Sequence, residues 1–458
     1  REDEQSSTIF IAAGKREFKN VALQPVLNGM WKTAYNRIAA TNDLIANVAG
    51  ENDSKFRQGE MERKMIYGEA LAIRALLHFD MLRLFAPAPV NDDGQAYIPY
   101  ITTFPEVLGT HIPVKASLDM VIKDLEEARE LVKLYDFSPL GMSANASGEA
   151  RFYNNLEYGM EGYGKTEDLD EFFFGRGYRF SYWAITGLLA RAYQYKAAYD
   201  ASFYEKAKIL AQEILDAKCT DDKGGGSYSP FKNEDFNGFS FVEDPEQMKD
   251  IRMAGNLLLG IYRDNDAEQK LSGMEASFPR EKKSPGQYSF CAVNVDGQDI
   301  FKTTGGIDES KEDIRCLRLL YKPINSYNIL LSTKWYVKTR DMDERKRTLN
   351  IFPILRTSEM RFIIAETLAR NNEFDKAYEI LNEMRRNRGL RNGDLTTQTS
   401  LEGFLKDLVR EGQREWISEG QLFYLYKRLN FNVKREDGTQ APFKKEECVV
   451  PLPIEELK

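Results

Sequence analysis

The stretch TSEMRFIIAETLARNNEFDKAYEILNEMRRNRGL, residues 357–390, predicts two short amphipathic helices that meet at Asn371-Asn372. Apolar residues recur on one face of each helix at α-helical spacing. These faces comprise Met360, Ile363, Ile364 and Leu368 in the first helix, and Phe374, Ala377, Tyr378, Leu381 and Met384 in the second. Because such a pair cannot bury its apolar face alone, it is typical of a fold built from stacked helical hairpins.

The ends of these helices are predicted from short polar residues and glycine. Ser358 is expected to cap the first helix and Asn372 the second, because such side chains accept hydrogen bonds from free N–H groups of the first turn. Gly389 follows a basic run at 385–388 and is a typical C-terminal stop.

A second copy of the pattern occupies residues 188–215, with a linker five residues longer. Ala190-Arg191-Ala192 corresponds to Ala365-Glu366-Thr367, and Phe203–Ala207 corresponds to Glu373–Ala377. The pattern of small and aromatic residues resembles a tetratricopeptide repeat (TPR), although neither copy has the full consensus. Any antiparallel helical hairpin would account for it as well.

Composition excludes several classes of protein. The 458 residues allow two or three domains, and 42% hydrophobic and 29% charged residues are ordinary for a globular protein. The net charge of -8 argues against nucleic acid as a partner. No apolar run reaches the roughly 18 residues that span a bilayer.

No metal or cofactor motif is apparent, so we expect neither a metal nor a cofactor. The four cysteines are far apart and form no CxxC pair, and histidine occurs only at His78 and His111. The even cysteine count leaves disulfides open. Asp221-Asp222 and Asp296 with Asp299 could contact calcium, but EF-hand spacing is absent.

Apolar periodicity predicts helices over about 28–86, 117–133, 181–217, 355–390 and 401–429. Residues 1–24 are polar and are expected to be extended. Ser117 is expected to cap the helix that runs through Val132.

Polar residues inside these helices have structural interpretations. Asn42 lies among apolar neighbours, which favours a buried amide that ties a loop to its helix. Arg74 and Arg83 are interpreted as ion-pair or carbonyl partners. His78 is expected to be packed or half-exposed rather than catalytic, and Trp335 to lie in the core.

Long irregular stretches cover about 87–113, 135–180 and 219–350. Loops this long inside a compact chain are usually functional or disordered, and their many aromatic residues argue against disorder. Packing beneath the loops would explain each single ring equally well.

Six stretches, in order over nearly the whole chain, resemble the SusD/RagB-like glycan-binding outer-membrane lipoproteins of Bacteroidetes. They are 35–42 (YNRIAATN), 68–75 (GEALAIRA) with 82–85 (LRLF), 175–195, 355–360 with Ala365-Glu366, 411–427, and 450–456. The chain departs from the family pattern at Ala86, where glycine is usual, and at Gln421-Leu422 and Tyr424, where arginine and aspartate are usual.

This resemblance implies a single, mainly α domain over 1–458, with TPR-like helical hairpins forming a right-handed helical scaffold. Long irregular loops would form a ligand face, and β-strands would be few and short. It also implies a lipidated N-terminal cysteine ahead of Arg1, anchored in the outer membrane at the cell surface. The protein would capture oligosaccharide or polysaccharide without catalysis and pass it to a SusC-like TonB-dependent transporter.

Sugars present apolar C–H faces and rims of hydroxyls, which aromatic rings and polar side chains recognise together. The candidate glycan contacts in the loops are Asn91, Asp92, Tyr97, Tyr100, Tyr153, Tyr158 and Tyr288. Phe172-Phe173-Phe174 is an alternative patch that could meet the transporter.

Two other functions remain open from the residues. A glycoside hydrolase on a helical scaffold would need two carboxylates about 5–10 Å apart, and no local motif nominates such a pair. A TPR-type interaction scaffold would bind peptide in a concave groove and would have no affinity for sugar.

Overall fold

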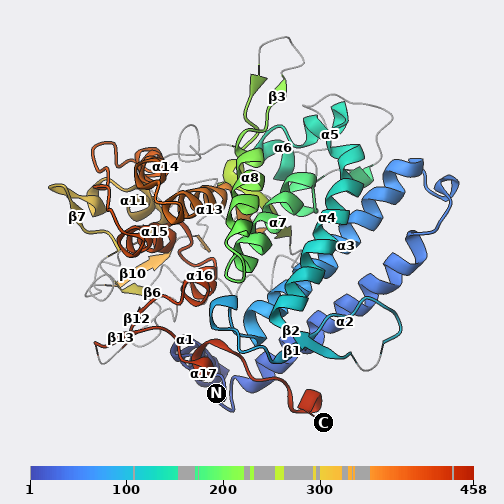
Figure 1. The fold of residues 1–458 in the computed structure, drawn as a ribbon, viewed down its shortest axis with the longest axis horizontal. Coiled ribbons are helices and arrows are strands. Elements are labelled where there is room, and N and C mark those ends of the chain that lie inside the picture. Colours follow the sequence, from blue (N-terminus) through green and yellow to red (C-terminus); the bar gives the residue numbers. More distant parts are fainter. Residues whose placement is uncertain are drawn as a thin grey trace. The chain divides into compact units, whose positions relative to one another are not determined.

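The computed structural model is mainly helical and contains a few short strands (Figure 1). It describes residues 2–106, 109–152, 171–173, 175–220, 227–231, 253–262, 292–294, 300–321, 329–332, 334–335, 351–435 and 438–457. The predicted mainly α fold with helical hairpins is confirmed. Contacts divide the chain into two compact units, and the chain passes between them four times, once inside α8 (Ser202–Leu215). The single domain expected over 1–458 stays a prediction.

The first unit contains residues 1–138, 180–207 and 421–458. Its centre is a row of helices in which α2 (Gln24–Val48), α3 (Gly59–Phe85), α4 (Val114–Asp136) and α7 (Tyr182–Lys196) pack in that order (Figure 1). The unit also contains β1 (Ala96–Pro99), β2 (His111–Pro113), α16 (Leu422–Leu429), β12 (Val433–Lys434), β13 (Gln440–Ala441) and α17 (Lys445–Cys448). Strands β1 and β2 pair antiparallel, as do β12 and β13.

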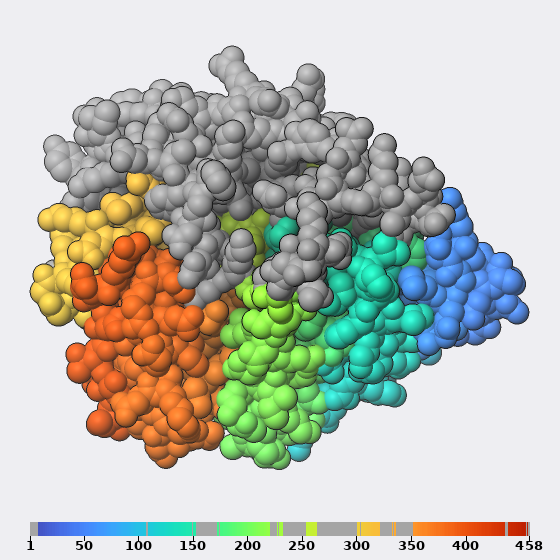
Figure 2. Space-filling model, turned by 90° about the horizontal axis from the view of Figure 1, so that it is seen from above, coloured from blue at the N-terminus to red at the C-terminus, as the bar shows by residue number. Residues whose placement is uncertain are grey.

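The second unit contains residues 139–179 and 208–420. Helices α13 (Thr357–Arg370) and α14 (Phe374–Asn387) form the hairpin of the opening stretch, and α15 (Leu401–Glu415) packs on both. In Figure 2 the yellow residues 300–321 lie against the orange surface of these helices. The short helices are α5 (Pro139–Ala144), α6 (Gly148–Phe152) and α11 (Ile314–Leu319).

Short antiparallel strands complete the second unit. Strand β5 (Leu257–Tyr262) pairs with β11 (Ile351–Arg356), and β10 (Ile329–Ser332) lies between β6 (Ala292–Asn294) and β9 (Leu320–Tyr321). The remaining pairs are β3 (Cys219–Thr220) with β4 (Ser227–Tyr228), and β7 (Thr303–Thr304) with β8 (Ile307–Asp308). Within the described ranges, no helix is long and apolar enough to cross a bilayer.

The N-terminal segment is helical, so the expectation of an extended segment over 1–24 was wrong. Helix α1 covers Glu2–Lys15. Good helix formers such as glutamate and alanine occupy it without a proline, and Ala12 is buried. Polarity was therefore a misleading sign, because a helix with one small buried contact can be polar nearly all round.

The three predicted N-caps were also wrong, whereas α14 ends just before Gly389 (φ +93°), as predicted. Helix α13 begins at Thr357, which places Ser358 inside its first turn and buries it. Helix α14 begins after Glu373, because Asn372 adopts a left-handed conformation with φ +63° and turns the chain instead. Helix α4 begins at Val114, so Ser117 is an interior, buried residue.

The helix expected over 401–429 is two helices. A break at 416–421 separates α15 from α16, and Ser418 and Gly420 have φ values of +61° and +76° there. Continuous apolar periodicity concealed the break, because both helices present buried residues to the core.

Gly68 sets the spacing between α3 and α4. A Cβ at this position would lie 2.8 Å from Val132 Cγ1 and 3.0 Å from the Ala128 carbonyl oxygen. We predict that Gly68→Ala lowers the free energy of unfolding by about 1–3 kcal/mol, because the two helices must move apart. Denaturant unfolding followed by circular dichroism measures this change.

Gly29→Ala is the matched control, because Gly29 lies in the interior of α2 and a Cβ added there would have no neighbour within 4 Å. This variant is expected to gain about 0.5–1 kcal/mol from helix propensity. Equal effects of the two substitutions would contradict the close packing of α3 on α4.

Candidate functional site

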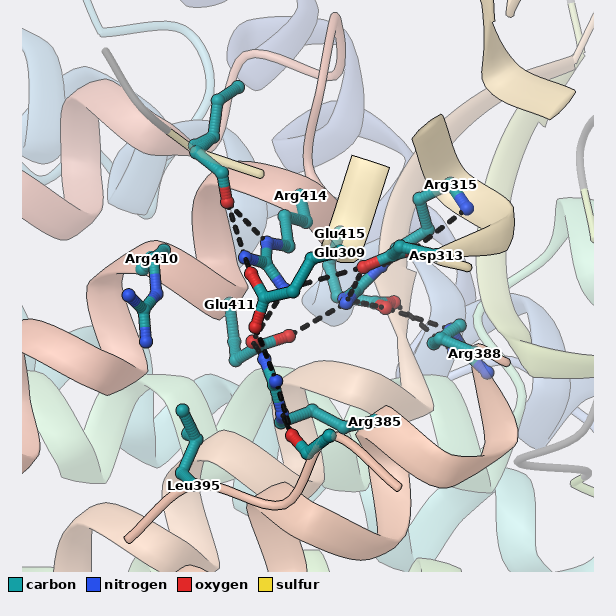
Figure 3. Close-up of polar contacts among 12 residues, drawn as sticks. Glu309, Asp313, Arg315, Arg385, Arg388, Leu395, Arg410, Glu411, Arg414 and Glu415 are labelled. Carbon is teal, nitrogen blue, oxygen red and sulfur yellow. Dashed lines mark hydrogen bonds and ion pairs between the residues drawn. The ribbon is translucent and has the colours of Figure 1, made fainter. Parts of the chain in front are cut away.

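Four arginines and four acids meet inside the second unit, and we call them the charged cluster (Figure 3). Its members are Glu309, Asp313, Arg315, Arg385, Arg388, Glu411, Arg414 and Glu415. No member is more than 2% exposed. They come from the segment 309–315, from α14 and from α15, so the cluster joins three separate parts of the chain.

Glu411 lies at the centre of the charged cluster. Its carboxylate accepts hydrogen bonds from Arg315 at 2.8 Å, Arg385 at 2.6 Å and Arg414 at 3.1 Å. Arg385 continues to Glu309 at 2.5 Å. A carboxylate surrounded by three guanidinium groups is held ionised, and the pKa of Glu411 is accordingly lowered despite the opposing effect of its burial.

The neighbouring acids behave in the same way. Glu415 accepts from Arg388 at 2.8 Å and from Arg315 at 2.9 Å. Glu419 accepts two hydrogen bonds from Arg356, both at 2.8 Å. Burial acts to raise the pKa of each acid, but the adjacent positive charges more than offset it and lower both values to about 2.

These acids do not suit catalysis of glycoside hydrolysis. A general acid for that reaction needs a raised pKa and contact with the substrate. Glu411 and Glu415 have lowered pKa values, and the carboxylates of the cluster are buried, so its role is structural.

In the first unit, Arg74 ties a loop to the row of helices. Its guanidinium forms two 2.7 Å hydrogen bonds to Asp124 of α4 and one of 3.1 Å to Asn42 of α2. Asn42 in turn donates to the carbonyl oxygens of Ile101 at 3.0 Å and Thr103 at 3.3 Å. The structural interpretations of Asn42 and Arg74 are confirmed.

His78 is packed inside the same unit, as predicted. Its Nε2 accepts the Ile101 N–H at 3.0 Å, so Nδ1 carries the proton and donates to the Arg74 carbonyl at 2.9 Å. Burial lowers the pKa of His78 to about 3. The Tyr100 ring stacks on His78 at a centroid distance of 3.9 Å, and its hydroxyl donates to Asp124 at 2.7 Å.

Lys427 of α16 caps the C-terminal end of α3. Its buried amino group donates to the carbonyl oxygens of Arg83 and Ala86, both at 2.6 Å. Burial lowers the pKa of Lys427 to about 7. Arg83 itself pairs with Asp80 and lies 4.1 Å over the Tyr424 ring, so its predicted structural role is confirmed.

The loop that follows α3 presents Asn91 and Asp92 at the surface of the first unit. Asn91 ends the short 3-10 helix η2 (Pro89–Asn91) and donates to Asn430 Oδ1 at 2.9 Å. Asp92 accepts the Tyr199 hydroxyl and, at 3.0 Å, the Gly94 N–H. Both candidate residues therefore lie beside polar groups from distant parts of the chain.

The two tyrosines of this loop have structural contacts. Tyr97 is 8% exposed, and its hydroxyl donates to Asp93 at 2.8 Å. Lys445 pairs with Asp93 at 2.7 Å and lies 5.2 Å over the Tyr97 ring. Because Tyr97 is covered and Tyr100 is stacked on His78, neither ring is open as a platform in this structure.

The other predicted contacts, Tyr153, Tyr158 and Tyr288, lie outside the described residues, as does Phe174 of the alternative patch. Phe173 is buried and Phe172 packs edge-on against it. Trp335 is buried, and its Nε1 donates to the Ser418 carbonyl at 2.9 Å, which confirms its predicted place in the core.

Sequence reasoning missed Tyr199, Asn430 and Lys445, which the fold brings to the loop of Asn91. They follow that loop by between 107 and 352 residues along the chain. Only Asn430 carried a local sign, since an asparagine directly after an apolar helix often adopts the left-handed conformation that ends it. Its φ is +49°.

Three cysteines, Cys219, Cys316 and Cys448, are free thiols, and Cys291 lies outside the described residues. Over the part of the chain that the structure describes, no group of three or more His, Cys, Asp or Glu residues could hold a metal ion. The aspartates considered for calcium are not described.

The fold and these contacts define a helical-hairpin protein with a structural charged cluster and loops that carry polar and aromatic residues. Residues 11–153 match a SusD-like family described as starch-binding and associating with the outer membrane, and residues 321–447 match the SusD family. The chain belongs to the SusD/RagB-like family. The curated proteins contain no significant match.

Solved structures share the fold. A SusD superfamily protein from Bacteroides thetaiotaomicron has 19% identity and a TM-score of 0.63, covering 93% of this chain and 83% of its own. A SusD-like carbohydrate binding protein from Bacteroides vulgatus has 18% identity and a TM-score of 0.60, covering 93% and 82%. A SusD superfamily protein from Parabacteroides distasonis has 15% identity and a TM-score of 0.57, covering 90% and 77%.

Removing the central charge of the cluster should destabilise the protein. We predict that Glu411→Gln lowers the free energy of unfolding by about 3–5 kcal/mol, because three guanidinium groups lose their shared counter-charge inside the core. Denaturant unfolding at pH 7 checks this value. Glu402→Gln is the control, since Glu402 forms an exposed 2.7 Å pair with Lys406 and should leave the free energy of unfolding nearly unchanged.

Lys427 predicts a distinctive pH dependence. Its pKa is about 7 in the folded protein and lies below the ordinary value of 10.5, so the unfolded chain binds more protons between these values. The free energy of unfolding should therefore rise with pH from 7 to 9, by up to about 1.4 kcal/mol per unit relative to Lys427→Met. Parallel pH profiles for the two proteins would show that Lys427 keeps an ordinary pKa.

Proposed function

We propose that this protein is a non-catalytic carbohydrate-binding protein of the cell surface. It captures oligosaccharide or polysaccharide and delivers it to a SusC-like TonB-dependent transporter. A lipid anchor ahead of the chain would hold it in the outer membrane. The observation that carries the proposal is membership of the SusD/RagB-like family through two separate parts of the chain.

The described residues support binding rather than hydrolysis. Glu411 and Glu415 are paired with arginines that lower the pKa of each carboxyl, so they offer no proton to a leaving group. The surface around Asn91 and Asp92 carries amides, carboxylates and hydroxyls, which recognise sugar hydroxyls. The loops at 87–113, 135–180 and 219–350 are proposed as the ligand face, with Tyr153, Tyr158 and Tyr288 as further contacts.

The test is calorimetry of the purified chain against oligosaccharides prepared from plant, host and microbial polysaccharides. We expect at least one ligand to bind with a dissociation constant in the micromolar to millimolar range, roughly -8 to -4 kcal/mol. The same mixture, incubated overnight and analysed by chromatography, should contain intact oligosaccharide. Shortened products would instead indicate a glycoside hydrolase.

A complete lack of sugar binding, together with saturable binding of peptides, would favour a TPR-type interaction scaffold. Binding of the sugar by an unfolded control sample would show that the calorimetric signal is not specific.

A further inference from the structure

One surface of the first unit joins paired amides to aromatic rings, and we call it the amide–aromatic surface. It consists of Asn91, Tyr426, Asn430, Phe431 and Phe443. The residues come from η2, from the C-terminal end of α16 and from the segment after it, and η2 packs on α16. All of them lie within the first unit.

Asn430 determines the shape of this surface. Its left-handed conformation, with φ +49°, ends α16 and turns the chain back. The Phe431 N–H then donates to the Tyr426 carbonyl oxygen at 2.9 Å. This turn brings the two rings together, with their centroids 5.7 Å apart and their planes at 54°. Both rings are half-buried, so each keeps part of its surface in solvent.

Phe443 packs beside Tyr426. Its centroid lies 6.3 Å from that of Tyr426, and the guanidinium of Arg16 lies 4.9 Å over its ring. Because Arg16 occupies one face of Phe443, ligand contact is assigned to Phe431 and Tyr426. Val90, in η2, adds an apolar side chain that is 48% exposed.

The two amides supply neutral hydrogen-bonding groups. Asn91 Nδ2 donates to Asn430 Oδ1 at 2.9 Å, and both side chains are exposed. This bond uses the amino group of Asn91 and the carbonyl oxygen of Asn430. The Asn91 carbonyl oxygen can accept and the Asn430 amino group can donate a further hydrogen bond, as recognition of sugar hydroxyls requires.

Two ion pairs lie beside this surface. Lys445 pairs with Asp93 at 2.7 Å, and Arg435 donates to Glu447 at 2.9 Å. Arg16, which lies over Phe443, donates to the Gly14 carbonyl oxygen at 3.2 Å. An acidic sugar is best held by a cation that can give its hydrogen bonds to the carboxylate. Because these three cations already have contacts and the amides are neutral, the surface favours a sugar without charge.

We propose that the amide–aromatic surface binds a neutral sugar unit, whose C–H face lies on Phe431 and Tyr426 and whose hydroxyls bond to Asn91 and Asn430. This inference rests on the proposed carbohydrate-binding function and names a place and a ligand class for it. An aromatic ring with a neighbouring amide offers an apolar face and neutral hydrogen-bonding groups, and a pyranose matches both.

The decisive variant is Asn430→Gly, because glycine keeps the left-handed conformation and removes only the amide. The neutral probes are maltohexaose, cellohexaose, xylohexaose and mannohexaose, and the acidic probe is hexagalacturonate. The neutral oligosaccharide that gives the strongest calorimetric signal in the test of the proposed function is added to them. We expect Asn430→Gly and Asn91→Ala each to weaken the neutral ligand about fivefold. Phe431→Ala should weaken it about tenfold or more.

The matched control is Asn372→Gly. Asn372 is also an exposed asparagine with a left-handed conformation, φ +63°, but it lies in the hairpin between α13 and α14. Its removal should leave the affinity unchanged. The melting temperature of each variant is measured alongside, and Asn430→Gly decides the question should Phe431→Ala unfold.

Four outcomes separate the inference from the function on which it rests. Weaker binding by Asn430→Gly and Asn91→Ala, with Asn372→Gly unchanged, supports the site. Wild-type binding that neither Asn variant weakens overturns the site and leaves the carbohydrate-binding function intact. Preference for hexagalacturonate, or an affinity that falls between 50 and 500 mM salt, overturns the neutral class. No binding of any sugar by the wild-type protein overturns both the site and the function.

Discussion

The burial of guanidinium groups in the second unit is the constraint on which that part of the structure depends. A charge moved from water into the core is costly unless an opposite charge and hydrogen bonds accompany it. The four arginines of the charged cluster meet four acids, and Glu411 alone serves three of them. Each arginine therefore requires the acids of another segment. Arg385 and Arg414 reach Glu309 and Asp313 only when the segment 300–321 lies on α14 and α15.

In the first unit, separate parts of the chain are joined by hydrogen bonds from neutral side chains and from single charged side chains. The loop after α3 is held at both of its ends. Lys427 binds the Ala86 carbonyl at its beginning, and Asn42 binds the carbonyls of Ile101 and Thr103 at its end. The surface at Asn91 thus belongs to a loop whose ends are fixed to helices. Such support reduces the ordering that a ligand must cause on binding, so weak contacts can still give measurable affinity.

The sequence allowed the helical architecture to be predicted, because apolar periodicity reports which face of a helix is buried. The prediction failed where one sequence pattern is compatible with more than one backbone structure. Polarity at 1–24 is compatible with a helix as well as with an extended segment, and α15 and α16 present one apolar pattern across a break. Ser358 and Ser117 resemble caps in sequence, yet both are buried inside helices. A cap depends on where the chain changes direction, which tertiary contacts decide.

The candidate site was predictable only in part, for a related reason. Its first segment, with Asn91 and Asp92, follows a recognisable helix and is rich in polar residues. Its other members, Asn430 and Lys445, approach it through long-range folding that no local pattern records. Residue type alone also favoured Tyr97 and Tyr100 as open rings, whereas Lys445 covers one and His78 the other.

Strong and weak contacts lie in different parts of the protein, and this division bears on how the protein can act. Strong, charge-assisted contacts are buried in the charged cluster, where they hold the fold. The exposed amides around Asn430 offer neutral hydrogen bonds, each contributing about 1 kcal/mol, beside half-buried rings. A ligand held by a few such contacts dissociates readily. The proposed capture of a sugar and its release to a transporter would require that weakness, because a tightly bound sugar would remain on the surface that captured it.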